Sequence, residues 1–104
     1  MLSSARFSVG QLIHHRRFGY RGVIFDVDPI FSLDDEWYEQ MATSQPPRDR
    51  PWYHVLVDGS GQVTYVAERN LEPDPSAAPI SHPLLDRFFD AFRDGRYAPS
   101  RSLN

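Results

Sequence analysis

Hydrophobic and polar residues alternate along four short stretches of the chain, which is typical of β-strands that bury one face. The clearest stretch covers residues 20–28, where Val23, Phe25 and Val27 are predicted to share a buried face. The other stretches are residues 11–15, 52–58 and 63–68. Short turns that contain glycine join residues 11–15 to 20–28 and residues 52–58 to 63–68, so the pattern predicts two antiparallel hairpins.

The stretch at residues 52–58 begins with aromatic residues and ends with aliphatic ones. Its alternation predicts that Val55 and Val57 belong to the core, on the same face as Tyr53. His54 lies on the other face, and we interpret it as a half-buried structural residue rather than a catalytic base. Trp52 shares that face and could anchor a protein partner or stack on nucleic-acid bases.

A short helix is predicted between the two hairpins, at residues 33–42. Leu33, Trp37 and Met41 recur at every fourth position there, which is the spacing of one helix face. Ser32 and Asp35 resemble a capping box at its start.

A longer helix is predicted near the end of the chain, at residues 82–94. Five large apolar side chains fall within one arc of roughly 140° when the segment is placed on a helical wheel. Ser81 is the predicted N-cap and Gly95 the predicted C-cap. We expect the stripe to pack on the strands or on a second subunit. It consists of Leu84, Leu85, Phe88, Phe89 and Phe92.

These elements predict one mainly β domain over residues 1–104, because the chain is too short for two cores. We expect a small, partly open antiparallel barrel at about residues 7–71 that carries the inserted loop and short helix. A linker at 72–80, the amphipathic helix at 82–94 and a tail at 95–104 follow.

The amino-acid composition excludes several classes of reactive site. The chain has no cysteine and no lysine, which excludes thiol nucleophiles, disulfides and Schiff-base lysines. It shows no signal-peptide pattern and no long apolar run, so we expect a cytoplasmic protein without membrane contact. The net charge of −3 is unusual for a nucleic-acid-binding domain.

The charges are segregated along the chain. Residues 1–25 contain arginine but no acid, whereas residues 26–45 contain six acids and no base. Such polarity suits an interface with a charged partner. The arginines of the first hairpin are Arg16, Arg17 and Arg21.

No active site is evident in the sequence. Asp26 and Asp28 share a strand face, with carboxylates about 6–7 Å apart, and could hold a cation or form an acid–base pair. We favour a solvated face, or ion pairs with the arginines of the first hairpin. The four histidines show no metal-binding spacing. We therefore expect no catalytic residue, cofactor or metal.

An ordered series of motifs resembles one known family. The motifs are Val9-Gly10-Gln11, Gly19-Tyr20-x-Gly22-Val23-Ile24, Asp26-x-Asp28-Pro29, Pro51-Trp52-Tyr53-His54-Val55 and Tyr65-Val66-Ala67-Glu68, together with His15 and Leu71. They are similar to the heat shock protein HspQ family, also called the YccV-like or hemimethylated-DNA-binding domain family. The resemblance implies an SH3-like barrel and a cytoplasmic, heat-induced, non-enzymatic protein that forms homo-oligomers, of which a trimer is one candidate.

The resemblance implies two functions. The first is an adaptor that promotes degradation of client proteins by the ATP-dependent protease Lon, and its candidate partner-binding residues are Phe31, Trp37, Tyr38 and Trp52. The alternative is a module that recognises hemimethylated DNA, with Arg16, Arg17 and Arg21 as candidate contacts. Because the chain is acidic, we expect DNA binding to be weak.

Overall fold

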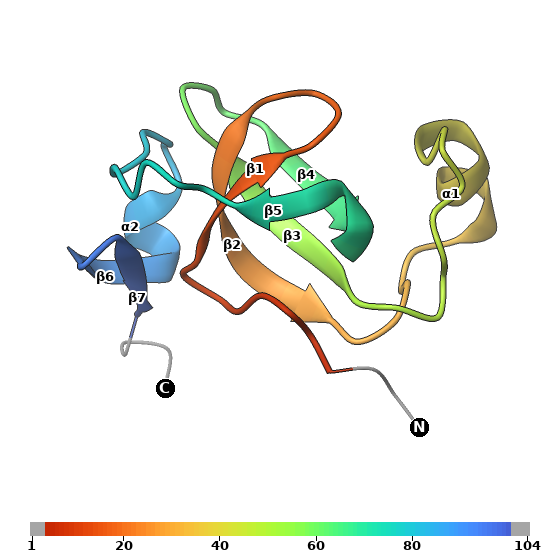
Figure 1. Cartoon of the computed structure of the whole chain (residues 1–104), viewed down its shortest axis with the longest axis horizontal. Helices are drawn as coiled ribbons and strands as arrows, with labels where there is room; N and C mark the ends of the chain where they lie inside the picture. Colours follow the sequence, from red (N-terminus) through yellow and green to blue (C-terminus); the bar gives the residue numbers. More distant parts are fainter. Residues whose placement is uncertain (1–3, 101–104) are drawn as a thin grey trace.

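The computed structural model describes residues 4–100, and its centre is a five-stranded antiparallel sheet (Figure 1). The strand order is β4-β3-β2-β1-β5, and β4 is not paired with β5, so the sheet stays open. A 3-10 turn, Glu68–Asn70, leads into β5, which returns beside β1. This confirms the predicted mainly β, partly open fold. The strands are β1 Leu12–His15, β2 Arg21–Asp28, β3 Trp52–Val57, β4 Val63–Ala67 and β5 Leu71–Pro73.

The interior of the curved sheet is filled by one cluster, which we call the inner core. Val55 is fully buried in it, and Val57 is also buried, as the alternation of β3 predicts. Trp52 and Leu56 on the opposite face of β3 are equally buried, because both faces of this strand are covered. The inner core consists of Phe7, Ile13, Ile24, Tyr53, Val55, Val66 and Leu71.

A β-bulge interrupts β2. Ile24 pairs with Val55 and Asp26 pairs with His54, so Phe25 is an extra residue. The prediction that Val23 and Val27 share a face is wrong, because the extra residue reverses the alternation. Val23 packs beside Leu12 and Leu56, whereas Val27 packs on the inner core. The same reversal places Asp26 and Asp28 on the face of His54.

The predicted helix at residues 82–94 is wrong. One helical turn, α2 Leu85–Phe88, is followed by the hairpin of β6 Phe89–Arg93 and β7 Arg96–Pro99. Asp94 and Gly95 both have positive φ, so Gly95 belongs to a two-residue hairpin turn and caps no helix. Ser81 is not an N-cap either, since Leu84 holds that position. Residues 101–104 of the predicted tail lie outside the described residues.

The hairpin forms because it buries its aromatic residues on the sheet. Phe89 and Tyr97 lie against each other, with ring centroids 5.4 Å apart, and pack on Leu12 and Val23. The remaining residues of the predicted stripe pack on the same group, so the expected burial of the stripe on the strands is confirmed although its secondary structure differs. We call this group the hairpin cluster: Leu12, Val23, Leu56, Ile80, Phe89 and Tyr97.

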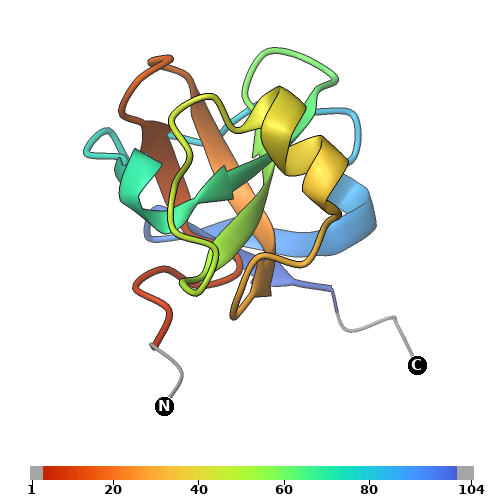
Figure 2. The same cartoon turned by 90° about the vertical axis from the view of Figure 1, so that its right-hand side faces the viewer.

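The inserted helix exists as α1 Asp35–Met41. Its N-cap is Asp34, whose side chain accepts a hydrogen bond from the Trp37 N–H at 2.8 Å, and not the predicted Ser32. Helix α1 and the α2–β6–β7 unit stand at opposite ends of the sheet (Figure 1), and the turned view looks onto α1 (Figure 2). Among residues 4–100, no helix is long and apolar enough to cross a membrane.

Candidate functional site

An apolar groove of about 620 Å³ lies between α1, the β1–β2 turn and strand β4. Five large hydrophobic side chains are exposed among the described residues, and four of them line this groove. The fifth, Ile30, lies outside it. Clustering of this kind, rather than scattered exposure, marks an interaction surface. The four residues are Phe18, Leu33, Met41 and Val63.

The β1–β2 turn forms one wall of the groove. Phe18 is 71% exposed at its tip, and its ring stacks on His15 at 4.6 Å. His15 Nδ1 accepts the N–H groups of Arg17 and Phe18 at 3.1 and 3.0 Å. Burial, and then the charge of Arg17, lower the pKa of His15. The neutral imidazole therefore holds the turn, because a protonated Nδ1 could not accept these bonds.

Helix α1 and its flanking loops form the opposite wall. They are anchored by a group that we call the aromatic cluster: Phe31, Ala42, Trp52 and Ala67, with Trp37, Tyr38 and Tyr65 packed against it. The Arg48 guanidinium lies 4.8 Å from the ring centres of both Phe31 and Tyr38. The Trp52 Nε1–H donates to the Pro47 carbonyl at 3.1 Å. The long insertion is therefore an ordered wall.

Strand β4 forms the floor of the groove and one edge of the sheet. Glu68 N–H donates to the Pro51 carbonyl, and Val57 N–H donates to the Gln62 carbonyl. Because inward and outward backbone groups alternate along an antiparallel strand, Val63 and Tyr65 direct their N–H and C=O groups away from β3. Within the described residues, no other strand pairs with this side of β4.

The candidate partner-binding residues have different positions in this architecture. Phe31 and Trp52 are buried in the aromatic cluster, beneath the groove wall. Trp37 lines the groove, whereas Tyr38 does not line it and donates its hydroxyl to the Pro46 carbonyl at 2.6 Å. Sequence reasoning missed Phe18 as a groove residue. An aromatic side chain at the tip of an arginine-rich turn is the signal that could have identified it.

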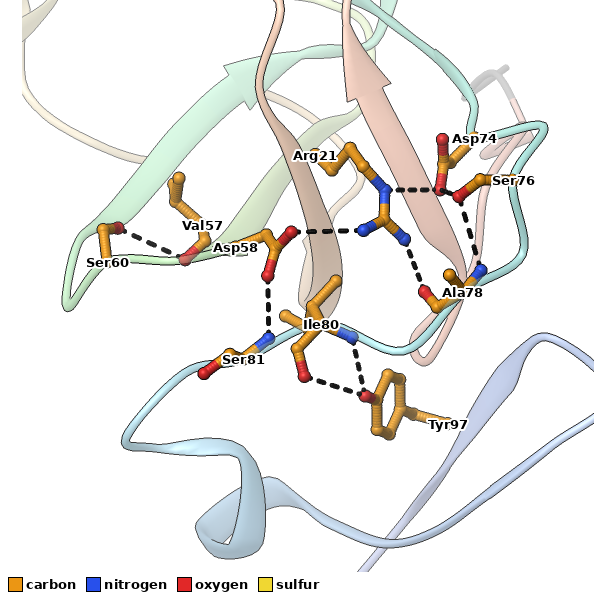
Figure 3. Close-up of polar contacts among 10 residues, drawn as sticks. All are labelled: Arg21, Val57, Asp58, Ser60, Asp74, Ser76, Ala78, Ile80, Ser81 and Tyr97. Atoms are coloured by element: carbon orange, nitrogen blue, oxygen red, sulfur yellow. Dashed lines mark hydrogen bonds and ion pairs between the residues drawn. The ribbon is translucent and has the colours of Figure 1, made fainter.

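The three candidate DNA-contacting arginines are not equivalent. Arg21 donates to Asp74 at 2.8 Å, to Asp58 at 3.1 Å and to the Ala78 carbonyl (Figure 3). Asp58 in turn accepts the Ser81 N–H at 2.8 Å. Arg21 therefore holds the segment after β5 against the sheet, and its guanidinium is engaged in these intramolecular hydrogen bonds.

The other two arginines remain at the surface of the β1–β2 turn. Arg16 lies 3.7 Å from Glu72 and also donates to the Leu71 carbonyl. The Arg17 guanidinium lies 6.0 Å from the Phe18 ring centre. Arg16 and Arg17 are exposed, so this turn presents two cations beside an aromatic ring.

A group that we call the polar cluster lies on the face of β3 between the hairpin cluster and the aromatic cluster. It consists of Asp26, Asp28, His54 and Tyr65. Asp28 accepts the Tyr65 hydroxyl at 2.7 Å, and His54 Nε2 lies 3.1 Å from the same carboxylate oxygen. Burial, and then the hydrogen bond to Asp28, raise the pKa of Tyr65. Of the two alternatives for Asp26 and Asp28, ion pairs with Arg16, Arg17 or Arg21 do not occur among the described ion pairs. Arg21 pairs with Asp58 and Asp74, and Arg16 lies beside Glu72.

The family can now be assigned. The model of the family described as "Hemimethylated DNA-binding protein YccV like" matches residues 5–96. The chain belongs to this family. The YccV-like domain therefore covers the sheet, the groove and the α2–β6 region through the β6–β7 turn.

Longer proteins carry similar sequences. The F-box only protein 21 of Homo sapiens and that of Mus musculus are each 35% identical to this chain over 99 residues. The match covers 93% of this chain but only 16% of each relative. The chain therefore spans about a sixth of the length of these curated relatives, and the YccV-like domain is one part of them.

Proposed function

We propose that this YccV-like domain is a non-enzymatic cytoplasmic adaptor that binds apolar segments of client proteins and promotes their degradation by the ATP-dependent protease Lon. The observation that carries the proposal is the concentration of exposed apolar side chains in one groove beside an unpaired strand edge. The protease itself is inferred from the resemblance to the HspQ family.

The groove suits an extended, partly unfolded segment. The outward N–H and C=O groups of Val63 and Tyr65 can pair with the backbone of any sequence, which gives affinity without strict sequence selection. Phe18, Leu33 and Met41 then contact apolar side chains of the segment. Such recognition fits denatured clients, because folded proteins rarely expose apolar stretches of this kind.

A purified degradation assay tests the proposal. Lon, ATP and a labelled denatured substrate are incubated with and without the full chain, and we expect the chain to accelerate degradation. Leu33→Asp should reduce the acceleration at least severalfold, because it places a charge in the groove. Ile30→Asp is the matched control, since Ile30 is 42% exposed and Leu33 40%, but Ile30 lies outside the groove. Equal losses in both variants, or no acceleration by the natural chain, would contradict the proposal.

The strand edge can be tested separately. Val63→Pro removes one outward N–H group while leaving the inward bonds of β4 in place. It should weaken client binding more than Val63→Ala, which removes only the side chain. Equal binding by the two variants would show that clients do not pair with β4.

Recognition of hemimethylated DNA is the second candidate, favoured by the description of the family. With Arg21 occupied, Arg16 and Arg17 can supply about two phosphate contacts, which corresponds to a slope of about −1.8 for log affinity against log salt. Fluorescence anisotropy with hemimethylated and unmethylated duplexes distinguishes the candidates. Tight, methylation-dependent binding at physiological salt, with no effect on Lon, would favour the DNA function.

The proposal includes a homo-oligomer, as the family resemblance implies. A trimer of the 12.0 kDa chain would have a mass of about 36 kDa (3 × 12.0). Light scattering coupled to size-exclusion chromatography measures this mass directly, and a mass of 12.0 kDa at all concentrations would contradict this part of the proposal.

A further inference from the structure

Three side chains of types that can hold a metal ion meet at the polar cluster. Asp26 and Asp28 from β2 and His54 from β3 each offer one donor atom, and the three atoms all lie within 4.8 Å of one another. His54 Nε2 and Asp28 Oδ2 are 3.1 Å apart. Separate positions in the sequence, residues 26–28 and residue 54, are brought together by the pairing of β2 with β3.

The bulge in β2 creates this meeting. In a regular strand Phe25 would pair with His54, and Asp26 and Asp28 would face the inner core side of the sheet. With Phe25 as an extra residue, Asp26 lies directly opposite His54 in the strand pairing. Bulges are frequent where a strand must aim a functional side chain.

Other residues hold the two carboxylates in position. The Tyr65 hydroxyl donates to Asp28 at 2.7 Å, and the Val27 N–H donates to Asp26 Oδ1 at 2.9 Å. Hydrogen bonds of this kind orient metal ligands and are part of most metal sites. The Tyr65 hydroxyl is itself fixed by the Ser32 N–H at 3.1 Å.

We propose that Asp26, Asp28 and His54 form a binding site for a divalent first-row transition metal ion of the Zn²⁺ class. Two donors 3.1 Å apart that each lie about 2.0–2.1 Å from one ion subtend an angle of about 100° at the ion, which suits a tetrahedral site. Water completes the coordination. The imidazole favours Zn²⁺, Co²⁺ or Ni²⁺ over Mg²⁺ and Ca²⁺, which prefer oxygen ligands alone.

The site has an electrostatic basis as well. Two carboxylates on one strand face repel each other, and among the described ion pairs only His54 contacts either of them. A divalent cation neutralises both charges at once. The site is partly open to solvent, since Asp26 is exposed and the other two ligands are half-buried, so an ion can enter without unfolding of the sheet.

Isothermal titration of the untagged, chelator-treated chain with ZnCl₂ is the primary test, and the visible absorption of added Co²⁺ reports the coordination geometry. We expect one ion per chain and at least tenfold weaker binding in both His54→Ala and Asp26→Asn. Asn retains the acceptor for the Val27 N–H, so the fold is preserved in the second variant. Tyr65→Phe should weaken binding by about tenfold, because only the orienting hydroxyl is lost.

His14→Ala is the matched control. His14 Nδ1 lies 2.9 Å from Glu72, so it forms a similar histidine–carboxylate pair, but among the described ion pairs no second carboxylate contacts His14, and Arg16 lies 3.7 Å from Glu72. Zn²⁺ binding should be unchanged in this variant. The proposal is overturned if the chain binds no Zn²⁺ at submillimolar concentration, if Asp26→Asn binds as the natural chain does, or if His14→Ala loses as much affinity as His54→Ala. These results do not depend on the adaptor function, because no client or protease is present.

Discussion

Replacement of Arg21 by glutamine distinguishes a structural role of this residue from a role in DNA contact. Its guanidinium binds Asp74, Asp58 and the Ala78 carbonyl, and the Asp74 side chain is only 4% exposed. Loss of the cation would leave the Asp74 carboxylate almost buried without its charge partner. The structural role therefore predicts a large loss of stability, whereas a residue that only contacts phosphate would cost almost nothing.

The size of the expected stability loss follows from the burial of the ion pair. Loss of one partner from a fully buried ion pair costs about 3–5 kcal/mol. The Arg21 side chain is 25% exposed, and glutamine can keep one hydrogen bond, so we expect Arg21→Gln to lower the free energy of unfolding by about 2–3 kcal/mol. For a chain of this length, the loss corresponds to a decrease of about 8–12 °C in the melting temperature.

The dependence on pH gives a second signature. Burial alone would raise the pKa of Asp74, but hydrogen bonds from Ser76 and Arg21, together with the arginine charge, hold it below 3.8. A carboxyl with a lowered pKa contributes stability that is present above about pH 4 and is lost as the pH falls through the folded-state value. The natural chain should therefore lose this contribution in acid, and Arg21→Gln should lose less.

Urea unfolding, followed by circular dichroism between pH 7 and pH 3, measures both effects. Arg17→Gln is the matched control, because Arg17 is exposed and binds no carboxylate among the described ion pairs; it should change stability by less than about 0.5 kcal/mol. A midpoint for Arg21→Gln within error of that for Arg17→Gln would refute the structural role of Arg21.

Three further predictions concern other parts of the fold. In urea unfolding, Gly10→Ala should lower the free energy of unfolding by about 3 kcal/mol or more, since a Cβ there would lie 2.0 Å from the Tyr97 carbonyl oxygen and φ is +92°. Gly59→Ala is the control: φ is +75° but the space around it is open, so it should cost only about 1 kcal/mol. His15 has a lowered pKa, so the stability that it supports is full above pH 6.5 and is lost as the pH falls below it; His15→Asn should flatten the stability profile between pH 7.5 and 5.5. Val55→Ala should cost about 1–3 kcal/mol because this side chain is fully buried, and an unchanged thermal melt would contradict its place in the core.

Four of the five strands of the central sheet could be predicted because each buries at least one face, and burial imposes a period of two on the sequence. Strand β5, Leu71–Pro73, was missed, because three residues are too few to show a period and two of them lie in the predicted linker. The bulge at Phe25 could not be predicted. Val23, Phe25 and Val27 alternate perfectly in the sequence, and the extra residue is visible only when β2 is paired with β3. Register is a property of two strands, whereas alternation is a property of one.

The C-terminal region shows how two local signals compete. Apolar residues at residues 84–92 match a helical period, and this favoured the predicted helix. Asp94-Gly95 is also a strong signal for a two-residue hairpin turn. The structure follows the turn, because the hairpin brings the ring centroids of Phe92 and Tyr97 within 4.6 Å of each other and buries Phe89. Tertiary burial of aromatic side chains outweighed the helical period.

The groove could not be predicted because its walls come from distant segments. Phe18 lies on a turn, Met41 on a helix and Val63 on an edge strand, and each is unremarkable in its own context. Only the fold brings them together. Of the candidate partner-binding residues, Trp37 lines the groove, whereas Phe31 and Trp52 are buried beneath its wall and do not face a partner.

Tyr65 connects the groove to the polar cluster. Its side chain lines the groove, while its hydroxyl donates to Asp28 and accepts the Ser32 N–H at the entrance to α1. An ion bound by Asp28 and a client segment packed on Tyr65 would therefore act on the same side chain. Coupling between two binding sites is reciprocal, so an ion that strengthens client binding must be bound more tightly when the client is present. Because Tyr65→Phe keeps the ring in the groove and removes only the hydroxyl, it should leave client binding in place and remove its dependence on the metal. One variant can separate client binding from metal dependence because the Tyr65 ring lies in the groove and its hydroxyl contacts the metal ligand Asp28.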